Sequence, residues 1–338
     1  MFSELGLFIN PQGHQRFVQL QPVIITDKMG FKVSIIGGGG RVGSDAAYAL
    51  QLGGKVREIA LVDANPDMAD GEALDLRHGS SLTSNIKFTS SSSYDIVNGS
   101  DCVVITAGLR RKPDETRLDL INRNVGLFKG ILESLKGVKL AEGATIVVVS
   151  NPVDILTHLA AKSGILPESQ VLGLGTVLDT ARFRSLLADH FNLSAPDVKA
   201  LVLGEHGDTM VPILSSATAQ GVPLTSYPGV DAEAVKGVFE FTRKSGAEVI
   251  RLKGGAGRAV GVSIKEVVEA IALDSHAILP VSAVQSGKLG IEGISLSLPT
   301  VVGRHGVVEI IEPAVSAEEK ELLHKSAASL KEIWAQIQ

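Results

Sequence analysis

A histidine between two glycines, His206, is the residue of this chain best suited to acid–base chemistry. It follows an apolar run, in the order Gly204-Glu205-His206-Gly207-Asp208. A turn after a strand can hold a reactive group rigidly and still expose it, and imidazole gives or takes a proton near neutral pH. A lone histidine is more often a surface residue or a satisfied hydrogen-bonding residue, so a catalytic interpretation requires partners.

Candidate partners occur in the segment Leu178-Asp179-Thr180-Ala181-Arg182, where Asp179 and Arg182 are three residues apart on one face of a predicted helix. One interpretation is an exposed intrahelical ion pair worth roughly a few tenths of a kcal/mol. In the other, Asp179 accepts the imidazole N–H and stabilises the imidazolium, while Arg182 binds a substrate carboxylate with two hydrogen bonds. The spacing alone does not choose between them.

The glycine-rich segment near residue 40 predicts a dinucleotide site. Gly38, Gly40 and Gly43 form the pattern G-x-G-x-x-G after a predicted strand and at the start of a predicted helix, and Asp63 ends the next strand. Glycines allow a pyrophosphate to approach the free N–H groups of a helix N-terminus. A carboxylate at Asp63 would accept hydrogen bonds from the adenosine ribose and repel a 2′-phosphate, which favours NAD over NADP. A merely flexible loop is the alternative.

Two further loops follow predicted strands, where ligand crevices open in α/β proteins. Segment 108–117 carries four cations in ten residues, which also suits a solvated loop or a phosphate patch. Asn151, in Ser150-Asn151-Pro152-Val153-Asp154, has an ordinary Asn-Pro turn as its alternative.

The elements that must position these residues alternate between short apolar strands and helices. This rhythm predicts a doubly wound parallel sheet of the Rossmann type, buried on both faces. The expected strands are 32–36, 58–62, 86–88, 101–106 and 145–150, and the expected helices are 42–52, 67–78 and 118–135.

The pattern changes beyond about residue 175 and predicts an α+β substrate domain. Ser316 and Glu319 form a capping box at the start of the last helix. The other expected elements are helices 178–190 and 232–252 and strands 200–203, 278–284, 300–302 and 307–311. We therefore predict an α/β protein with an NAD-binding domain at 31–174 and a substrate domain at 175–338. Residues 1–30 fit neither a helix nor a strand pattern and are expected to be a disordered leader or an upstream-misplaced start.

Composition excludes several classes of protein. The 338 residues suggest two domains. With 32 basic and 37 acidic residues, a net charge of −5 gives nucleic-acid binding little electrostatic support. No apolar run approaches the ~20 residues of a membrane helix. The single cysteine, Cys102, excludes a disulfide within the chain and a cysteine-rich metal site, and its apolar neighbours predict an inert core thiol. We expect no metal.

Taken together, these blocks resemble the lactate/malate dehydrogenase superfamily, specifically its lactate dehydrogenase-like malate dehydrogenases. They occur in the family's order and approximate spacing from about residue 31 to the C-terminus. The matching blocks are the glycine pattern with Asp63, Thr106-Ala107-Gly108, the arginine-rich loop, Ser150-Asn151-Pro152-Val153-Asp154, Leu178-Asp179-Thr180-Ala181-Arg182 and Gly204-Glu205-His206-Gly207-Asp208.

The resemblance implies a role for each polar residue. His206 resembles the proton donor and acceptor, and Asp179 resembles its orienting partner. Arg182 resembles the clamp on the substrate's C1 carboxylate. Arg117 resembles the group that polarises the reacting carbonyl, and Asn151 the donor to the substrate oxygen near the nicotinamide.

The resemblance also implies a lid at 109–117 that closes over the substrate and excludes water. The NAD site that it implies comprises Gly38, Gly40, Arg41, Val42, Gly43, Asp63, Thr106, Ala107, Gly108, Asn124, Val149 and Asn151.

Arg111 aligns with the lid position that reads the variable end of the substrate, which is glutamine in lactate enzymes and arginine in malate enzymes. Oxaloacetate carries a second carboxylate, and closing a dry lid over an unpaired carboxylate costs several kcal/mol. The resemblance implies a pocket position near Ala256 and Gly257, and both residues are small enough to leave room for this carboxylate. We therefore expect malate and oxaloacetate as substrates. Lactate and pyruvate are the alternative, and a non-catalytic NAD-binding protein is a rival from another class.

The resemblance implies a homo-oligomer, with a tetramer favoured over a dimer, and a cytoplasmic location. Asp114 departs from the glycine that the lid commonly has. The sequence Glu115-Thr116-Arg117-Leu118-Asp119-Leu120 resembles that of a lactate enzyme. Arg258, beside the pocket segment, has no role that the sequence assigns.

Overall fold

The computed structural model describes residues 7–9, 15–17, 30–109, 114–228 and 230–337, in two compact units, 1–30 and 31–338. In the first unit, β1 (Leu7–Ile9) pairs antiparallel with β2 (Gln15–Phe17). We expected neither a helix nor a strand here, and that expectation is wrong for these two strands. A three-residue strand is too short to show the alternation from which strands are predicted.

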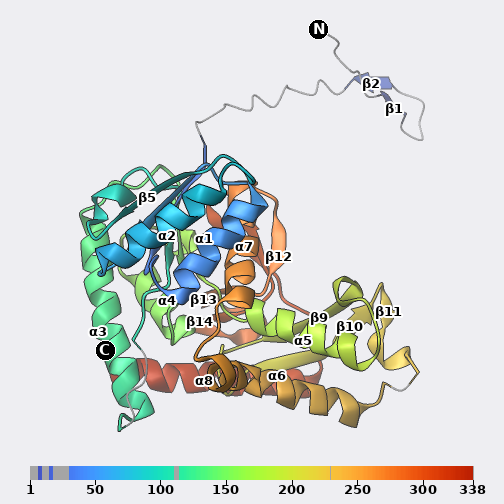
Figure 1. The fold of residues 1–338 in the computed structure, drawn as a ribbon. Helices are drawn as coiled ribbons and strands as arrows, with labels where there is room; N and C mark the ends of the chain where they lie inside the picture. The colour runs from blue at the N-terminus through green and yellow to red at the C-terminus, as the bar shows by residue number, and fades with distance from the viewer. Residues whose placement is uncertain (1–6, 10–14, 18–29, 110–113, 229, 338) are drawn as a thin grey trace. The chain divides into compact units, whose positions relative to one another are not determined.

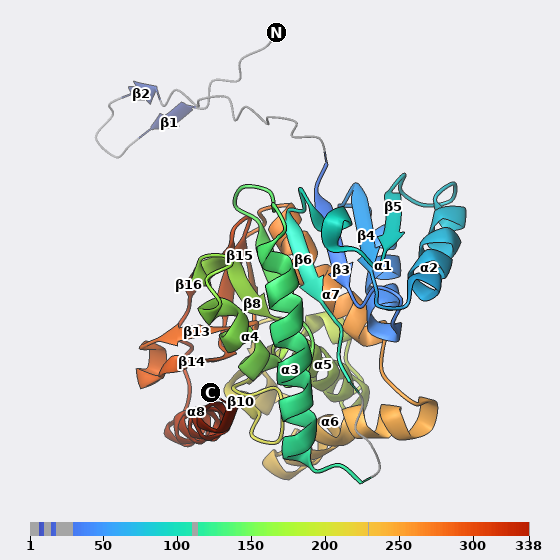
Figure 2. The ribbon, with the colours of Figure 1, turned by 90° about the vertical axis from the view of Figure 1, so that its left-hand side faces the viewer.

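The second unit is built on a mainly parallel sheet (Figures 1 and 2), which confirms the predicted α/β class. Within the described residues it has eight strands in the order β14-β13-β8-β7-β6-β3-β4-β5. The six from β3 to β8 pair in parallel, and β13 and β14 are antiparallel additions at one edge. Their bounds are β3 Lys32–Ile36, β4 Glu58–Val62, β5 Lys87–Ser91, β6 Cys102–Ile105, β7 Thr145–Val148, β8 Val171–Gly173, β13 Ser282–Ser286 and β14 Glu292–Ser297.

Helices cover both faces of this sheet because successive strand residues point to opposite sides. Cys102 and Val104 of β6 belong to the core beneath α1, α2 and α7, whereas Val103 and Ile105 belong to the core beneath α3 and α4. These helices span α1 Arg41–Gly53, α2 Pro66–Gly79, α3 Arg117–Lys136, α4 Val153–Lys162 and α7 Arg258–Ala272. The predicted helices 42–52, 67–78 and 118–135 each agree with an observed helix to within one residue at either end.

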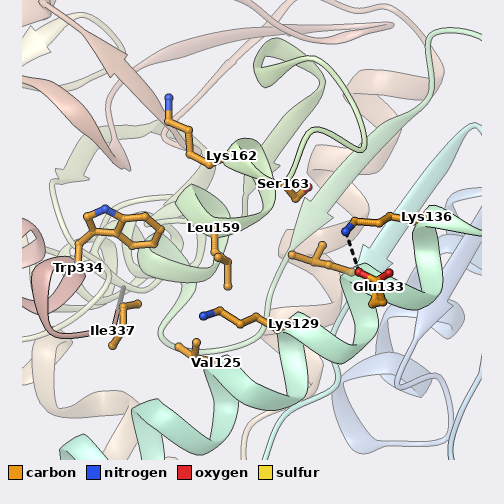
Figure 3. Close-up of a pocket in the computed structure, with 10 residues that line it drawn as sticks. Val125, Lys129, Glu133, Lys136, Leu159, Lys162, Ser163, Trp334 and Ile337 are labelled. Carbon is orange, nitrogen blue, oxygen red and sulfur yellow. Dashed lines mark hydrogen bonds and ion pairs between the residues drawn. The ribbon is translucent and has the colours of Figure 1, made fainter.

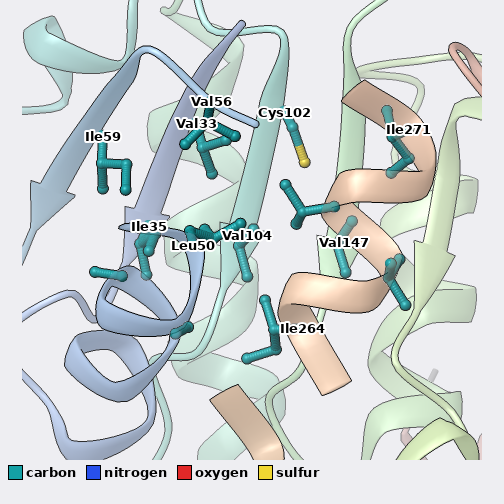
Figure 4. Close-up of a cluster of buried hydrophobic side chains, with 14 of the residues drawn as sticks. Val33, Ile35, Leu50, Val56, Ile59, Cys102, Val104, Val147, Ile264 and Ile271 are labelled. Carbon is teal, nitrogen blue, oxygen red and sulfur yellow. The ribbon is translucent and has the colours of Figure 1, made fainter. Parts of the chain in front are cut away.

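Figure 4 shows how a late part of the chain completes this core: Ile264 and Ile271 of α7 lie against residues of β3 and β6. The close approach of α7 to α1 depends on Gly261, where a Cβ atom would lie 2.6 Å from the backbone oxygen of Asp45. The thiol of Cys102 lies in the same core, and burial raises its pKa to about 12, which confirms the inert thiol.

Two three-stranded antiparallel sheets complete the described second unit. β9 (Val198–Leu203), β10 (Val211–Ala219) and β11 (Val222–Pro223) form one, and β12 (Ala277–Leu279), β15 (Thr300–Gly303) and β16 (Gly306–Ile310) form the other. The remaining helices are α5 Val177–His190, α6 Ala232–Lys253 and α8 Ala317–Ile337. The capping box at the start of α8 is confirmed, because each of Ser316 and Glu319 accepts a hydrogen bond from the other's N–H.

The expected strand 278–284 is wrong as a single element. The structure divides it at Pro280 and Val281 into β12 and β13, which belong to different sheets. Proline has no N–H to give to a strand ladder, so it suits such a break.

Candidate functional site

The glycine turn between β3 and α1 is shaped to receive a phosphate. Gly37 has a φ of +88°, and a Cβ there would lie 2.7 Å from the Ala107 nitrogen. A side chain at Gly43 would collide with the Gly37 carbonyl oxygen. Gly40 is the N-cap of α1, and no side chain of the described residues caps the helix there. The N–H groups of its first turn are therefore donors suited to an anion.

Asp63 lies beside this turn, directly after β4. Its Oδ2 accepts a hydrogen bond from the Gly39 N–H at 3.0 Å, and its Oδ1 accepts one from the Asn65 N–H at 3.0 Å. The carboxylate thus fixes the turn at the position where we predicted the ribose contact.

The other residues of the predicted cofactor site follow the carboxyl ends of β6 and β7. The Thr106 hydroxyl donates to the Ile36 carbonyl at 3.0 Å, and the Val149 N–H donates to the Ile105 carbonyl at 2.9 Å. Asn124 is buried, and its side-chain oxygen accepts a hydrogen bond from the Leu109 N–H at 2.7 Å, so it anchors the start of the arginine-rich loop. Ala107, Gly108 and Asn151 lie at the same edge of the sheet.

Arg41 and Arg258 connect α1 to the turn between α6 and α7. The Arg41 guanidinium donates to the carbonyl oxygens of Lys253 and Gly255, at 3.0 and 2.8 Å. Arg258 pairs with the Asp45 carboxylate at 2.5 Å. Arg258, to which the sequence assigned no role, therefore links the start of α7 to α1, the helix that follows the glycine turn.

The structure brings together the two predicted catalytic residues and one predicted substrate-binding residue, Arg182. His206 Nδ1 is hydrogen-bonded to Asp179 Oδ2, and Asp179 Oδ1 accepts a hydrogen bond from Arg182 Nη1 at 3.0 Å. Asp179 is only 1% exposed, so the interpretation as an exposed intrahelical ion pair is wrong.

The loop that carries His206 is fixed on both sides. Gly204, with a φ of +86°, exchanges two backbone hydrogen bonds with Ser297 of β14. The next N–H, that of Glu205, donates to the Ser326 hydroxyl of α8 at 2.7 Å. The main sheet and α8 therefore set the position of the histidine together.

The local charges shift the pKa of each member of this pair towards its ionised form. Burial is the largest single influence on His206 and lowers its pKa, but the charge and hydrogen bond of Asp179 together outweigh it, and the net pKa is raised. Burial raises the pKa of Asp179, but His206 and Arg182 reverse this effect and the net pKa is lowered. An imidazolium beside a carboxylate is the state that can give a proton to a substrate oxygen.

A cavity of about 270 Å³ opens beside His206. Asn151 lies on its wall, as the predicted role requires. Asp154 and two residues of α8, Leu330 and Ile333, also line it and were not predicted as site residues. Asp154 stands out in the sequence only as an acid within an apolar run. The full lining is Leu109, Leu120, Ile121, Asn124, Asn151, Pro152, Asp154, Ile155, Glu205, His206, Leu330 and Ile333.

A larger cavity of about 480 Å³ lies between α3, α4 and α8 (Figure 3). Its wall contains Trp334 and Leu159, with Lys129 and an ion pair between Lys136 and Glu133 at its edge. It shares no lining residue with the cavity beside His206. His206 therefore lines the smaller cavity and not the larger one.

Two predicted substrate residues lie outside this description: Arg111, and the side chain of Arg117, whose backbone begins α3. Over the described ranges, no group of three histidine, cysteine or acidic residues could hold a metal ion. None of the helices described is long and apolar enough to cross a membrane.

Family models match almost the whole second unit. The lactate/malate dehydrogenase NAD-binding domain matches residues 31–173, and the lactate/malate dehydrogenase alpha/beta C-terminal domain matches residues 176–338. The chain belongs to the lactate/malate dehydrogenase family. The NAD-binding match confirms NAD as the cofactor, and the open glycine turn, the uncapped α1 and Asp63 fit it.

Named relatives of this family cover nearly the whole of the chain. It is 40% identical to L-lactate dehydrogenase 1 of Clostridium acetobutylicum, over 90% of this chain and 98% of the relative, and 41% identical to L-lactate dehydrogenase of Acetivibrio thermocellus, over 89% and 96%. The fold is similar to that of the minor L-lactate dehydrogenase of Enterococcus mundtii (TM-score 0.87, 34% identity) and to that of malate dehydrogenase of Salinibacter ruber (TM-score 0.85, 34% identity). Each comparison covers 91% of this chain and 98% of the other.

These similarities make the protein an NAD-dependent 2-hydroxy acid dehydrogenase of the lactate/malate dehydrogenase family. The names of the relatives lean towards lactate, whereas the resemblance that we identified in the sequence favoured malate.

Proposed function

We propose that this enzyme interconverts (S)-malate and oxaloacetate: (S)-malate + NAD⁺ gives oxaloacetate + NADH + H⁺. The observation that carries the dehydrogenase chemistry is the hydrogen-bonded pair of His206 and the buried Asp179, with Arg182 on the same carboxylate and the cavity beside the histidine. The residue that favours malate is Arg111.

In the oxidation, neutral His206 accepts the hydroxyl proton of the substrate at Nε2, since Nδ1 is engaged by Asp179. The resulting imidazolium is stabilised by the Asp179 carboxylate, as in other acid–base pairs of this kind. Bound NAD supplies the hydride acceptor. In the opposite direction the imidazolium returns its proton to the carbonyl oxygen.

Three polar groups would orient the substrate. Arg182 uses one guanidinium nitrogen on Asp179, so its planar fork can be shared between that carboxylate and the C1 carboxylate of the substrate. Asn151 would donate to the reacting oxygen from the cavity wall. Arg117 would act on the same oxygen, where negative charge develops during reduction of the carbonyl.

Arg111 would pair with the second carboxylate of oxaloacetate. With pyruvate the same arginine would be a buried charge without a partner, which is unfavourable. Lactate is the second candidate, because the named relatives at about 40% identity are L-lactate dehydrogenases. The names of these relatives point to lactate, whereas the arginine at position 111 points to malate, so the substrate has to be tested directly.

Steady-state oxidation of NADH with oxaloacetate and with pyruvate, side by side, tests the proposal. We expect kcat/KM to be higher for oxaloacetate by at least about tenfold, the value of one well-placed charge contact near 1.4 kcal/mol. A preference for pyruvate would establish lactate and pyruvate as the substrates. If the enzyme reduced neither oxaloacetate nor pyruvate, both the malate and the lactate assignments would be overturned.

The Arg111→Gln variant tests the lid residue. We expect it to lower kcat/KM for oxaloacetate about 100-fold and to favour pyruvate in relative terms, because the second carboxylate loses its partner. The neighbouring Arg110→Gln is a matched control that removes an equal charge from the same loop. An equal loss on both substrates in Arg111→Gln would contradict this role.

A further inference from the structure

Asp154 is a buried acid that the mechanism above does not use. It lies in the first turn of α4, is 2% exposed, and lines the cavity next to His206 and Asn151. Its Oδ2 accepts a hydrogen bond from the backbone N–H of His206 at 2.7 Å. Two carboxylates therefore hold the same histidine: Asp179 binds its ring, and Asp154 binds its main chain.

The second oxygen of Asp154 has no hydrogen-bond partner among the described residues, although it is buried. Ser282 is close enough to lower the pKa of Asp154, but its hydroxyl is also without a hydrogen-bond partner within the described chain. Burial dominates and raises the pKa of Asp154 to about 6. A buried carboxylate with one unpaired oxygen is costly to keep beside the cavity, so packing alone does not account for an acid at this position.

The position of Asp154 connects the two parts of the enzyme that must cooperate. It follows Asn151 on the turn after β7, in the region matched by the NAD-binding model, whereas His206 lies in the region matched by the C-terminal model. The hydrogen bond of 2.7 Å thus fixes the position of the His206 backbone relative to the turn that carries Asn151. This position matters because proton transfer needs a donor within about 3 Å of the reacting oxygen.

We propose that Asp154 is a second positioning residue for His206, which fixes the backbone of the histidine and supports its protonated form while Asp179 orients the ring. This inference rests on the proposed dehydrogenase function. Among the described residues, the charged groups close to His206 are Asp179 and Arg182 on α5, Asp154 on α4 and Glu205 on its own loop. Asp154 is hydrogen-bonded to the main chain of His206.

Two variants separate its hydrogen bond from its charge. Asp154→Asn keeps an oxygen for the His206 N–H and can direct its amide nitrogen towards Ser282, but it loses the charge. Asp154→Ala loses both. For reduction of the keto acid, we expect Asp154→Ala to lower kcat about 10- to 100-fold at unchanged NADH affinity, and Asp154→Asn to restore kcat to within about threefold of the natural enzyme.

The pH profile of kcat/KM between pH 5 and 9 is the readout that a merely structural role would not move. Reduction requires protonated His206, and removing a nearby negative charge lowers the pKa of His206. As the pH rises, both variants should therefore lose activity at a lower pH than the natural enzyme does. Glu319→Gln is the matched control. Glu319 is another buried carboxylate and accepts backbone N–H bonds from Leu214 and Ser215, so its variant should lower Tm and leave the pH midpoint in place.

The proposal is overturned if Asp154→Ala retains kcat, if Asp154→Asn is as slow as Asp154→Ala, or if the pH midpoint stays unchanged in both. These outcomes require a natural enzyme that turns over a keto acid. Absence of that turnover would instead reject the proposed function.

Discussion

Asp63 supports the backbone of the glycine turn, and we propose that it also binds the ribose of the cofactor. Its two oxygens accept hydrogen bonds from the N–H groups of Gly39 and Asn65, so the carboxylate shapes the turn that we propose as the pyrophosphate site. On this proposal, the ribose contact and the shape of the turn depend on one side chain. Removing the Asp63 side chain should lower the affinity for NADH through the loss of the ribose contact and through the loosened turn.

We expect Asp63→Ala to raise the Kd for NADH about tenfold or more and to lower Tm by only a few degrees, because two partly exposed hydrogen bonds contribute about 1 kcal/mol each. NADH fluorescence titration and thermal melting measure the two effects. Asp67→Ala, an exposed acid in the first turn of α2, is the control. Unchanged NADH affinity in Asp63→Ala would reject the ribose role.

Residue types and spacing predicted His206, Asp179 and Arg182 as a group, but they left an exposed ion pair as an equal alternative. The burial of Asp179 decides between the two, and burial depends on packing that a local pattern does not contain. Arg258 shows the same limit, because its partner Asp45 is 213 residues away. A contact at that separation has no local signature.

Among the elements, α4 and α8 meet at an aromatic contact. The rings of His158 and Trp334 pack edge to face with centroids 4.7 Å apart, and His158 Nδ1 is hydrogen-bonded to Ser295 at 3.2 Å. Burial, together with the charge of Lys162, lowers the pKa of His158 to about 4. The native protein therefore holds this histidine neutral.

This contact predicts a pH dependence of stability. Between pH 6.5 and 4, His158 binds a proton in the unfolded chain but stays neutral in the native chain. The free energy of unfolding therefore falls as the pH is lowered through this range, by about 3 kcal/mol in all. Urea unfolding at pH 7 and 4.5, followed by the fluorescence of Trp334, the only tryptophan in the sequence, measures it.

His158→Gln should lose most of this difference between the two pH values. A variant with the same pH dependence as the natural protein would show that other groups cause it.

The elements that the sequence predicted well have a clear period or a marked boundary. Strands 32–36 and 58–62 agree with β3 and β4 at both ends, since each ends in four consecutive buried residues and is followed by Gly37 or Asp63. We did not predict α4, in which eight of ten residues are buried, because a short helix covered on most sides has no polar face to reveal its period. For the same reason Asp154 was overlooked.

On the scale of the whole molecule, the second unit has a core that both family regions share. Residues of α7 pack with β3, β6 and α1, so the C-terminal region completes the helix layer of the NAD-binding sheet. Local sequence patterns predicted the parallel sheet but did not indicate that this layer would come from residues 258–272. We propose that the boundary between 31–174 and 175–338 separates functions rather than folding units.

A shared core predicts cooperative unfolding. We expect residues 31–338 to melt in a single calorimetric transition, with equal calorimetric and van't Hoff enthalpies. The Gly261→Leu variant, whose side chain would force α7 away from α1, should lower Tm by more than 10 °C without creating a second transition. Two separate transitions in the natural protein would instead favour independent domains.

The location of Cys102 has a practical consequence for handling the enzyme. A thiol with no exposed surface and a pKa of about 12 carries almost no thiolate at neutral pH, and the thiolate is the form that alkylating agents and peroxide attack. The only sulfhydryl in the sequence therefore becomes reactive only when the parallel sheet opens. Preparations should tolerate air without added reductant, and a maleimide would label only unfolded molecules.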